Sequence, residues 1–162
     1  MNVEVEPELV IRTAVAADLP ALQRVYRAAS LSNPGDAPLL LARPEYLVFA
    51  GEGIAAGRTL VALAGPPGSR RIVGFATLAT SQADGLELED LFVNPDWRRR
   101  GVARHLVQQI GNAARGAGSR RLWVTGNPHA LAFYLAVGFV QSDHVATELG
   151  TGMRMSLELS RS

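Results

Sequence analysis

The chain reads Leu91-Phe92-Val93-Asn94-Pro95-Asp96-Trp97-Arg98-Arg99-Arg100-Gly101-Val102-Ala103-Arg104 across the segment that decides its fold. A predicted strand over residues 86–93 ends at Asn94-Pro95-Asp96, which is a turn signal. A predicted helix follows near residues 101–117 and begins at a glycine. Free backbone N–H groups and the helix dipole favour an anion at such a helix start. Because Gly101 and Ala103 are small enough to let a phosphate reach the backbone, the segment predicts a phosphate-binding loop.

Two widespread phosphate-binding motifs do not explain this loop. A dinucleotide-binding fingerprint needs Gly-x-Gly-x-x-Gly, whereas the chain has Gly101-x-Ala103. A P-loop needs lysine, and all 16 basic residues of this chain are arginines. A run of three arginines is most often a solvated turn. Its place between a strand and a glycine-opened helix instead favours bidentate contacts to a phosphate.

Strand and helix signals alternate along the rest of the chain. Predicted strands cover residues 9–14, 59–64, 71–80, 86–93, 121–125, 139–147 and 153–159, with a turn at residues 150–152. Two early helices are predicted, one near residues 18–30 with Asp18 as its N-cap and one over residues 39–49 with a break at Pro44. A late helix begins after Asn127-Pro128 and ends at Gly138. Residues 51–57 contain three glycines and receive no assignment.

The order of these elements, β-α-α-β-β-β-α-β-α-β-β, predicts an α/β (α+β) fold. Strand, helix and strand over residues 86–125 imply a right-handed crossover between parallel strands, and the other connections resemble hairpins. We expect a mixed, mostly antiparallel central sheet of about six to seven strands with helices on both faces. The length predicts a single domain over residues 1–162, with its core at about residues 9–159.

Composition and charge exclude several classes of function. The chain has no cysteine, which excludes disulfides, thiolate metal sites and a cysteine nucleophile. No signal peptide and no apolar run of about 20 residues is present, so we expect a cytoplasmic protein. The three histidines share no metal-ligand spacing, so no metal is expected. The net charge of +1 hides a basic segment, because residues 97–142 carry +7 with no acid while residues 1–96 carry −5. This segment favours a small polyanionic ligand.

A second motif follows the loop at ordinary separation and reads Asn127-Pro128-His129-Ala130-Leu131-Ala132-Phe133-Tyr134-Leu135-Ala136-Val137-Gly138-Phe139. It resembles the Asn…Ala-x-x-Phe-Tyr-x-x-x-Gly-Phe motif of the GNAT superfamily of acetyl-CoA-dependent N-acetyltransferases. Arg98-x-x-Gly101-x-Ala103 likewise resembles the Arg/Gln-x-x-Gly-x-Gly/Ala signature of that family, and residues 88–95 look like its fourth strand. The resemblance covers roughly residues 9–159 and implies a GNAT-type sheet.

The resemblance implies a site for acetyl-CoA as cosubstrate. In the family, loop amides hold the pyrophosphate, and pantetheine lies between the splayed fourth and fifth strands. The implied coenzyme-binding residues are Leu91, Phe92, Val93, Arg98, Arg99, Arg100, Gly101, Val102, Ala103, Arg104, Asn127, Ala130, Phe133 and Tyr134. Asn127 is also explained as a helix N-cap alone, and both roles are compatible.

The resemblance also implies catalytic roles. Tyr134 matches the general acid that protonates the leaving thiolate, and the backbone N–H of Leu91 matches the donor that polarises the thioester carbonyl. Glu87 and Glu89, on one strand face, are the candidate bases, acting directly or through water. Asp90 points the other way unless a bulge intervenes, and His144 is a minor candidate. Solvated carboxylates with a water chain as base remain an alternative.

These features predict an enzyme that transfers an acetyl group from acetyl-CoA to a primary amine of a small molecule or peptide, by direct attack in a ternary complex. The alternative is a non-catalytic module that binds or senses acyl-CoA. Partners are acetyl-CoA and the amine, with a homodimer left open and with no nucleic acid or membrane, since no nucleic-acid readout motif is present. Acidic and aromatic residues suited to an amine are Tyr26, Asp36, Glu45, Tyr46, Asp143 and Glu148.

Overall fold

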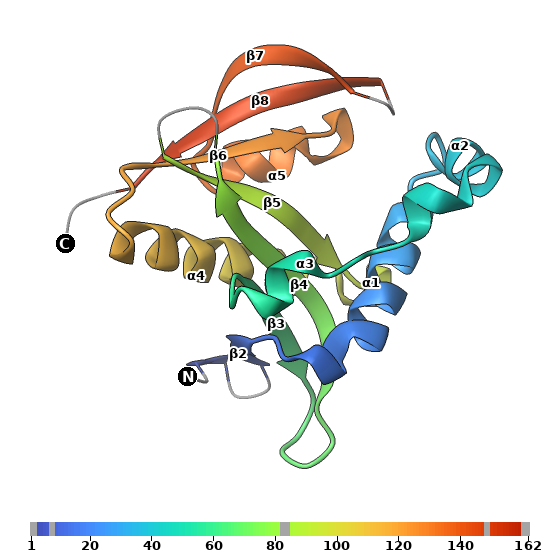
Figure 1. Ribbon diagram of the computed structural model, residues 1–162, viewed down its shortest axis with the longest axis vertical. Coiled ribbons are helices and arrows are strands. Elements are labelled where there is room, and N and C mark those ends of the chain that lie inside the picture. Colours follow the sequence, from blue (N-terminus) through green and yellow to red (C-terminus); the bar gives the residue numbers. More distant parts are fainter. Residues whose placement is uncertain (1–2, 7–8, 82–84, 148–149, 160–162) are drawn as a thin grey trace. The chain divides into compact units, whose positions relative to one another are not determined.

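The computed structural model describes residues 3–6, 9–81, 85–147 and 150–159. The chain forms two compact units, Met1–Thr77 with Asp90–Val107 and Leu78–Glu89 with Gln108–Ser162. Figure 1 labels the helices and strands. Three elements contribute residues to both units, namely β4 (Arg71–Thr80), β5 (Leu86–Val93) and α4 (Val102–Gly116). The strands are hydrogen-bonded in the order β1-β2-β3-β4-β5-β6-β8-β7. The predicted class, a mixed α/β fold with a mostly antiparallel sheet, is confirmed.

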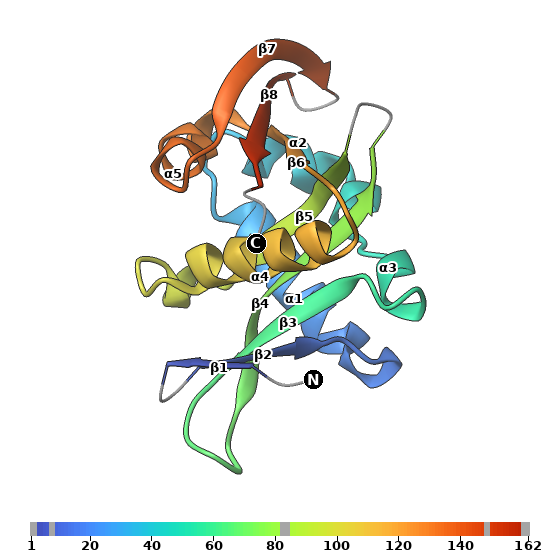
Figure 2. The same ribbon diagram turned by 90° about the vertical axis from the view of Figure 1, so that its left-hand side faces the viewer.

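Antiparallel strands form the sheet of the first unit. In hydrogen-bond order they are β1 (Val3–Glu6), β2 (Leu9–Thr13), β3 (Thr59–Ala64) and β4, which lie side by side in Figure 2. The strands predicted at residues 9–14, 59–64 and 71–80 are therefore confirmed. The sequence analysis did not predict β1, which adds a strand before β2.

Short helices and one longer helix lie between β2 and β3 in the sequence. They are η1 (Ala16–Asp18), α1 (Leu19–Leu31), α2 (Ala37–Ala42), η2 (Pro44–Leu47) and α3 (Glu52–Ala55). The predicted break at Pro44 is confirmed, because α2 ends before it. Asp18 lies at the predicted N-cap position of α1, but its side chain makes no capping hydrogen bond to that helix. Its carboxylate instead accepts two hydrogen bonds from Arg12, at 2.7 and 3.0 Å, and one from the Val15 N–H at 2.8 Å.

Helices cover both faces of β4 within the first unit. The Phe75 side chain is fully buried in a cluster that contains Leu22 and Val25 of α1. At the preceding residue, Gly74, an added Cβ would lie 3.1 Å from Val102 Cγ1 and 3.3 Å from Leu106 Cδ1 of α4. Successive residues of a strand point to opposite faces, so α1 and the start of α4 lie on opposite faces of β4. The helix start that carries the predicted phosphate loop is thus fixed against the sheet.

The second unit contains the parallel strand pair. β5 pairs in parallel with β6 (Arg121–Gly126), which confirms the predicted crossover. β8 (Gly150–Glu158) and β7 (Val140–Thr147) follow in antiparallel order, and η4 (Pro128–Ala130) and α5 (Leu131–Ala136) lie between β6 and β7 in the sequence. The predicted turn at residues 150–152 is wrong, because Gly150 pairs with Thr147 and Gly152 with Val145 inside the β7–β8 ladder.

The ladder between β5 and β6 is short. Among the described residues, these strands pair only at Leu86↔Leu122 and Glu87↔Trp123, whereas β6 pairs with β8 along its whole length. Within the second unit, Glu87 is therefore the last residue of β5 with a partner on β6.

Candidate active site

The phosphate loop in the first unit is shaped by local hydrogen bonds. Asn94 Oδ1 accepts the Asp96 N–H at 3.0 Å, and the 3₁₀ turn η3 (Pro95–Trp97) follows. The backbone then passes through the left-handed region twice, at Arg99 (φ 62°) and Gly101 (φ 81°). A non-glycine residue in this region is uncommon, and alternating backbone hands create concave rows of N–H groups that bind anions.

Several backbone N–H groups of the loop have no acceptor within the described residues. Within the described residues, the backbone N–H groups of Arg99, Arg100 and Gly101 have no hydrogen-bond acceptor. The first helical hydrogen bond of α4 runs from the His105 N–H to the Gly101 oxygen at 3.0 Å. The N–H groups of residues 102–104 in the first turn are therefore also without a helical partner. A consecutive row of donors at a helix start, in a segment without acids, suits a phosphate or another anion.

The arginine side chains of the loop are exposed, and two of them have defined partners. The Arg98 guanidinium donates to Ser32 Oγ at the end of α1, which ties the loop to that helix. The Arg100 guanidinium lies 4.7 Å from the centre of the Trp97 ring. Arg99 and Arg104 are exposed beside them, and Val102 is buried under the helix start.

At the end of β5 the side chains alternate. Phe92 packs edge-on against Tyr26 at 4.8 Å and tilted against Phe75 at 5.5 Å, so its ring belongs to the core of the first unit. Leu91 and Val93 have the opposite parity, and both are half-buried. The Phe92 side chain thus has a packing role, whereas the predicted coenzyme contacts of this strand involve backbone groups.

Tyr134 is the central side chain of the second unit. It is only 7% exposed, and its ring lies 5.3 Å from both Phe133 and Phe139, edge-on in each case. Its hydroxyl has no hydrogen-bond partner among the described residues. Burial raises the pKa of Tyr134 to about 12, because the phenolate would be desolvated. The hydroxyl therefore keeps its proton at neutral pH.

A glycine that the sequence analysis did not single out supports this ring. A Cβ at Gly126 of β6 would lie 2.8 Å from Cε2 and 3.1 Å from Cδ2 of Tyr134. The ring therefore rests directly on the backbone at the end of β6. Only the absence of a side chain at position 126 allows this approach.

The other predicted residues of this motif surround Tyr134 in the sequence. Asn127 caps η4, since its Oδ1 accepts the Ala130 N–H at 3.0 Å, so the structural role that its sequence predicted is observed. Ala130 and Phe133 are half-buried.

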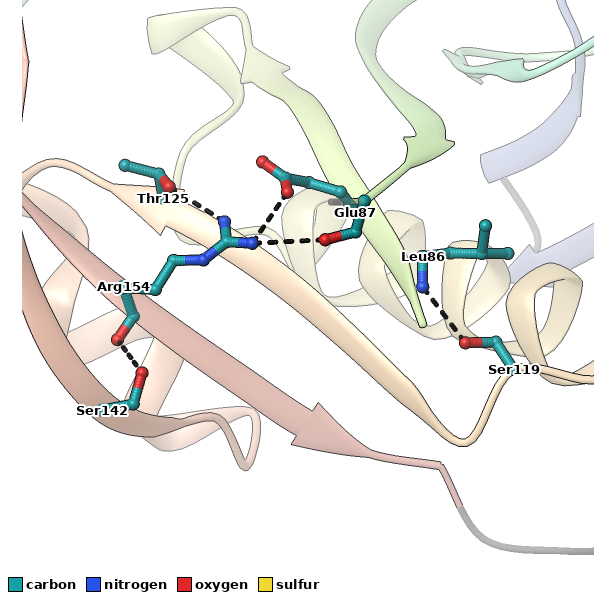
Figure 3. Close-up of polar contacts among 7 residues, drawn as sticks. Leu86, Glu87, Ser119, Thr125, Ser142 and Arg154 are labelled. Atoms are coloured by element: carbon teal, nitrogen blue, oxygen red, sulfur yellow. Dashed lines mark hydrogen bonds and ion pairs between the residues drawn. The ribbon is translucent and has the colours of Figure 1, made fainter. Parts of the chain in front are cut away.

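The two candidate bases differ in their surroundings. Glu89 is exposed. Glu87 Oε1 accepts a hydrogen bond from Arg154 Nη2 at 3.0 Å, and the same guanidinium donates to Thr125 Oγ1 at 3.0 Å (Figure 3). Sequence reasoning missed Arg154. Its only local signal is a charged residue between two methionines on the last strand, Met153-Arg154-Met155.

The residues that the sequence predicted for the acceptor site lie in both units. In the first unit the Tyr26 hydroxyl donates to the Tyr46 carbonyl at 2.6 Å, and burial together with the Asp90 charge raises the pKa of Tyr26. Asp36 is half-buried, Glu45 is exposed and, in the second unit, Asp143 is exposed. Glu148 lies outside the described residues. In the part of the chain that the structure describes, no helix is both long and apolar enough to span a bilayer, and no group of three metal-ligating side chains gathers.

Comparison with known proteins identifies the family. A family model described as the acetyltransferase (GNAT) family matches residues 22–139, which include parts of both units. The chain therefore belongs to the acetyltransferase (GNAT) family. This membership supports acetyl transfer in general.

Solved structures share the fold at low sequence identity. PaiA N-acetyltransferase from Thermoplasma acidophilum, solved with coenzyme A, is 19% identical with a TM-score of 0.73, covering 93% of this chain and 98% of that one. Nourseothricin acetyltransferase is 20% identical with a TM-score of 0.67, covering 94% and 99%. A GNAT-family acetyltransferase from Bacillus cereus is 21% identical with a TM-score of 0.68, covering 94% and 99%.

Proposed function

We propose that this protein is an N-acetyltransferase that moves an acetyl group from acetyl-CoA to a primary amine of a small molecule or peptide. Acetyl-CoA would supply a thioester whose carbonyl carbon the amine attacks. The observation that carries the proposal is Tyr134, a buried side chain with a raised pKa whose hydroxyl has no hydrogen-bond partner in the described residues. It lies in the motif where the family keeps its general acid.

Loop residues would hold the coenzyme. The row of unpaired N–H groups from residue 99 to residue 104 supports a role in binding the pyrophosphate, and the exposed Arg99, Arg100 and Arg104 add positive charge. The Leu91 N–H would polarise the thioester carbonyl as a fixed backbone donor. Asn127, Ala130 and Phe133 would contact the pantetheine arm.

Proton transfers divide between two side chains. As the carbon–sulfur bond breaks, Tyr134 would donate its proton to the sulfur, so that free thiol leaves. Glu87, directly or through a water, would take the proton that the amine nitrogen loses. Glu89 is the weaker candidate for this role because it is exposed and has no partner that orients it among the described contacts.

A thiol-release assay tests the proposal. Acetyl-CoA is offered with amines, polyamines, amino acids, aminoglycosides and short peptides, and free thiol is measured. We expect turnover with at least one amine class, and we expect Tyr134→Phe to lower kcat about 100-fold or more with little change in the KM of acetyl-CoA. Unchanged kcat in this variant, across several acceptors, refutes the acid role.

A binding measurement separates the enzyme from the alternative. Coenzyme A should raise the melting temperature of both the wild type and Tyr134→Phe, because the phosphate loop is intact in each. Stabilisation by coenzyme A without turnover of any amine supports a non-catalytic acyl-CoA-binding module. Absence of both turnover and stabilisation contradicts both functions.

A further inference from the structure

Arg154 of β8 makes an unusual set of contacts for a strand arginine. Its Nη1 donates to Thr125 Oγ1 at 3.0 Å, and its Nη2 donates to Glu87 Oε1 at 3.0 Å and to Ser81 Oγ at 3.4 Å (Figure 3). Its guanidinium also lies 5.0 Å from the centre of the Trp123 ring. Partners on three sides and an aromatic ring therefore fix one guanidinium in place.

Strand register explains how Arg154 reaches Glu87. Arg154 pairs with Thr125 across the β6–β8 ladder, and Glu87 pairs with Trp123 across the β5–β6 ladder. Directly paired residues share a face of the sheet, so the arginine crosses β6 on the face that carries Trp123 and Thr125. It meets Glu87 at the last β5–β6 pair of the described residues, where the ladder ends.

The pair is better fixed than an ordinary surface ion pair. The side chains are 20% exposed for Arg154 and 27% exposed for Glu87. An exposed pair gains little because both side chains must be immobilised, whereas here the arginine is already held by Thr125, Ser81 and the ring of Trp123. Only Oε1 of Glu87 is engaged, and Oε2 has no partner among the described residues.

We propose that Arg154 is a positioning residue for the acceptor half of the reaction: it holds Glu87 by Oε1 and leaves Oε2 to take the amine proton, directly or through a water. This inference rests on the proposed function. Other charged groups face the pair from neighbouring strands or adjoin it on its own strand. They are Glu89 on β5, Arg121 on β6, Asp143 on β7 in register with Arg154, and Glu158 on β8.

The test is a double-mutant cycle on the full-length enzyme with acetyl-CoA and the best amine. Its variants are Arg154→Met, Glu87→Gln and the double variant, with Arg154→Lys as the conservative replacement. Arg121→Met is the matched control, because this guanidinium also lies over Trp123, at 5.6 Å, but pairs with Glu158 at 3.5 Å and not with Glu87. Melting temperatures establish that each variant is folded.

We expect Arg154→Met to lower kcat/KM for the amine by about 10- to 100-fold, as for loss of a charge-assisted hydrogen bond, and to leave the KM of acetyl-CoA unchanged. Arg154→Lys should recover part of the loss, and Arg121→Met should match the wild type. In the Glu87→Gln background, Arg154→Met should cost no further activity, because it acts through Glu87.

Three results overturn the inference while leaving the enzyme activity established. One is an additive loss in the double variant, and another is an Arg154→Met variant whose kcat/KM for the amine matches that of the wild type. Full activity of Glu87→Gln overturns it as well, because Arg154 then has no base to position. Absence of wild-type turnover with every amine overturns the proposed function itself, and the inference with it.

Discussion

Gly126→Ala tests whether the position of the Tyr134 ring controls catalysis. The new Cβ would lie 2.8 Å from Tyr134 Cε2, whereas carbon atoms in contact prefer about 3.5–4.0 Å. The ring must therefore shift by about 1 Å. Phe133 and Phe139, each 5.3 Å from the ring centre, restrict where it can go. The backbone can accept alanine, because Gly126 is not among the residues with positive φ.

The shift has two measurable effects. Overpacking costs about 1–3 kcal/mol of unfolding free energy, partly offset by the lower entropy of alanine in the unfolded chain. A displacement of about 1 Å in a proton donor can reduce kcat about 100-fold. The KM of acetyl-CoA should stay within a few-fold of the wild type, since the phosphate loop is unchanged.

The assay is thiol release at saturating acetyl-CoA and amine, together with urea unfolding. Gly111→Ala is the matched control in the same unit, because its Cβ would lie 3.6 Å from Leu159 Cδ2, an ordinary contact. This control should keep kcat and gain up to about 1 kcal/mol from helix propensity. If Gly126→Ala keeps wild-type kcat while Tyr134→Phe loses about 100-fold, ring position does not limit catalysis and the reasoning is refuted.

Three further predictions concern stability and coenzyme binding. Folding raises the pKa of Tyr134 from 10.0 to about 12. The contribution of the protonated hydroxyl to the unfolding free energy is therefore complete below pH 10 and is lost toward pH 12. Wild type should lose about 3 kcal/mol over this range by urea unfolding, and Tyr134→Phe should lack that loss. Asp18→Asn should cost about 1–3 kcal/mol at neutral pH. Hydrogen bonds from Arg12 lower the pKa of Asp18, so the difference in unfolding free energy between wild type and Asp18→Asn should shrink as the solution is acidified through that pKa. A difference that stays constant in acid contradicts this role of Asp18. Gly101→Ala should cost about 1–2 kcal/mol at φ 81° and weaken thermal stabilisation by coenzyme A, whereas Gly35→Ala, with nothing within 4 Å of its Cβ, should do neither.

Elements with strong local signals were predictable from the sequence. The boundaries of β3, β4 and β5 agree with the prediction to the residue, because alternating apolar residues end at glycine or Asn-Pro turns. The turn and the helix start that follow β5 were predictable as well, because Asn94-Pro95 and Gly101 are strong local signals. α5 ends at Ala136, two residues before Gly138, where the sequence predicted the end of the helix.

Features set by distant partners were not predictable. Asp18 looks like a helix cap by its neighbours, but Arg12 takes its carboxylate. The glycines at residues 150–152 resemble a turn, yet pairing with β7 keeps them in β8. Glu87 could be proposed from its place on a strand face. Arg154 and Gly126 could not be connected to the site, because their contacts depend on strand register and on how the Tyr134 ring packs.

The chain has two tryptophans, and each lies beneath an arginine in a different unit. Trp97 lies under Arg100 in the phosphate loop, and Trp123 lies under Arg154 beside the Glu87 pair. Each indole is therefore an intrinsic fluorophore for one proposed binding step, Trp97 for the coenzyme and Trp123 for the acceptor. In Trp123→Phe, emission would report coenzyme binding at the loop, and in Trp97→Phe it would report the acceptor side, so that the order of substrate binding can be followed without an attached dye.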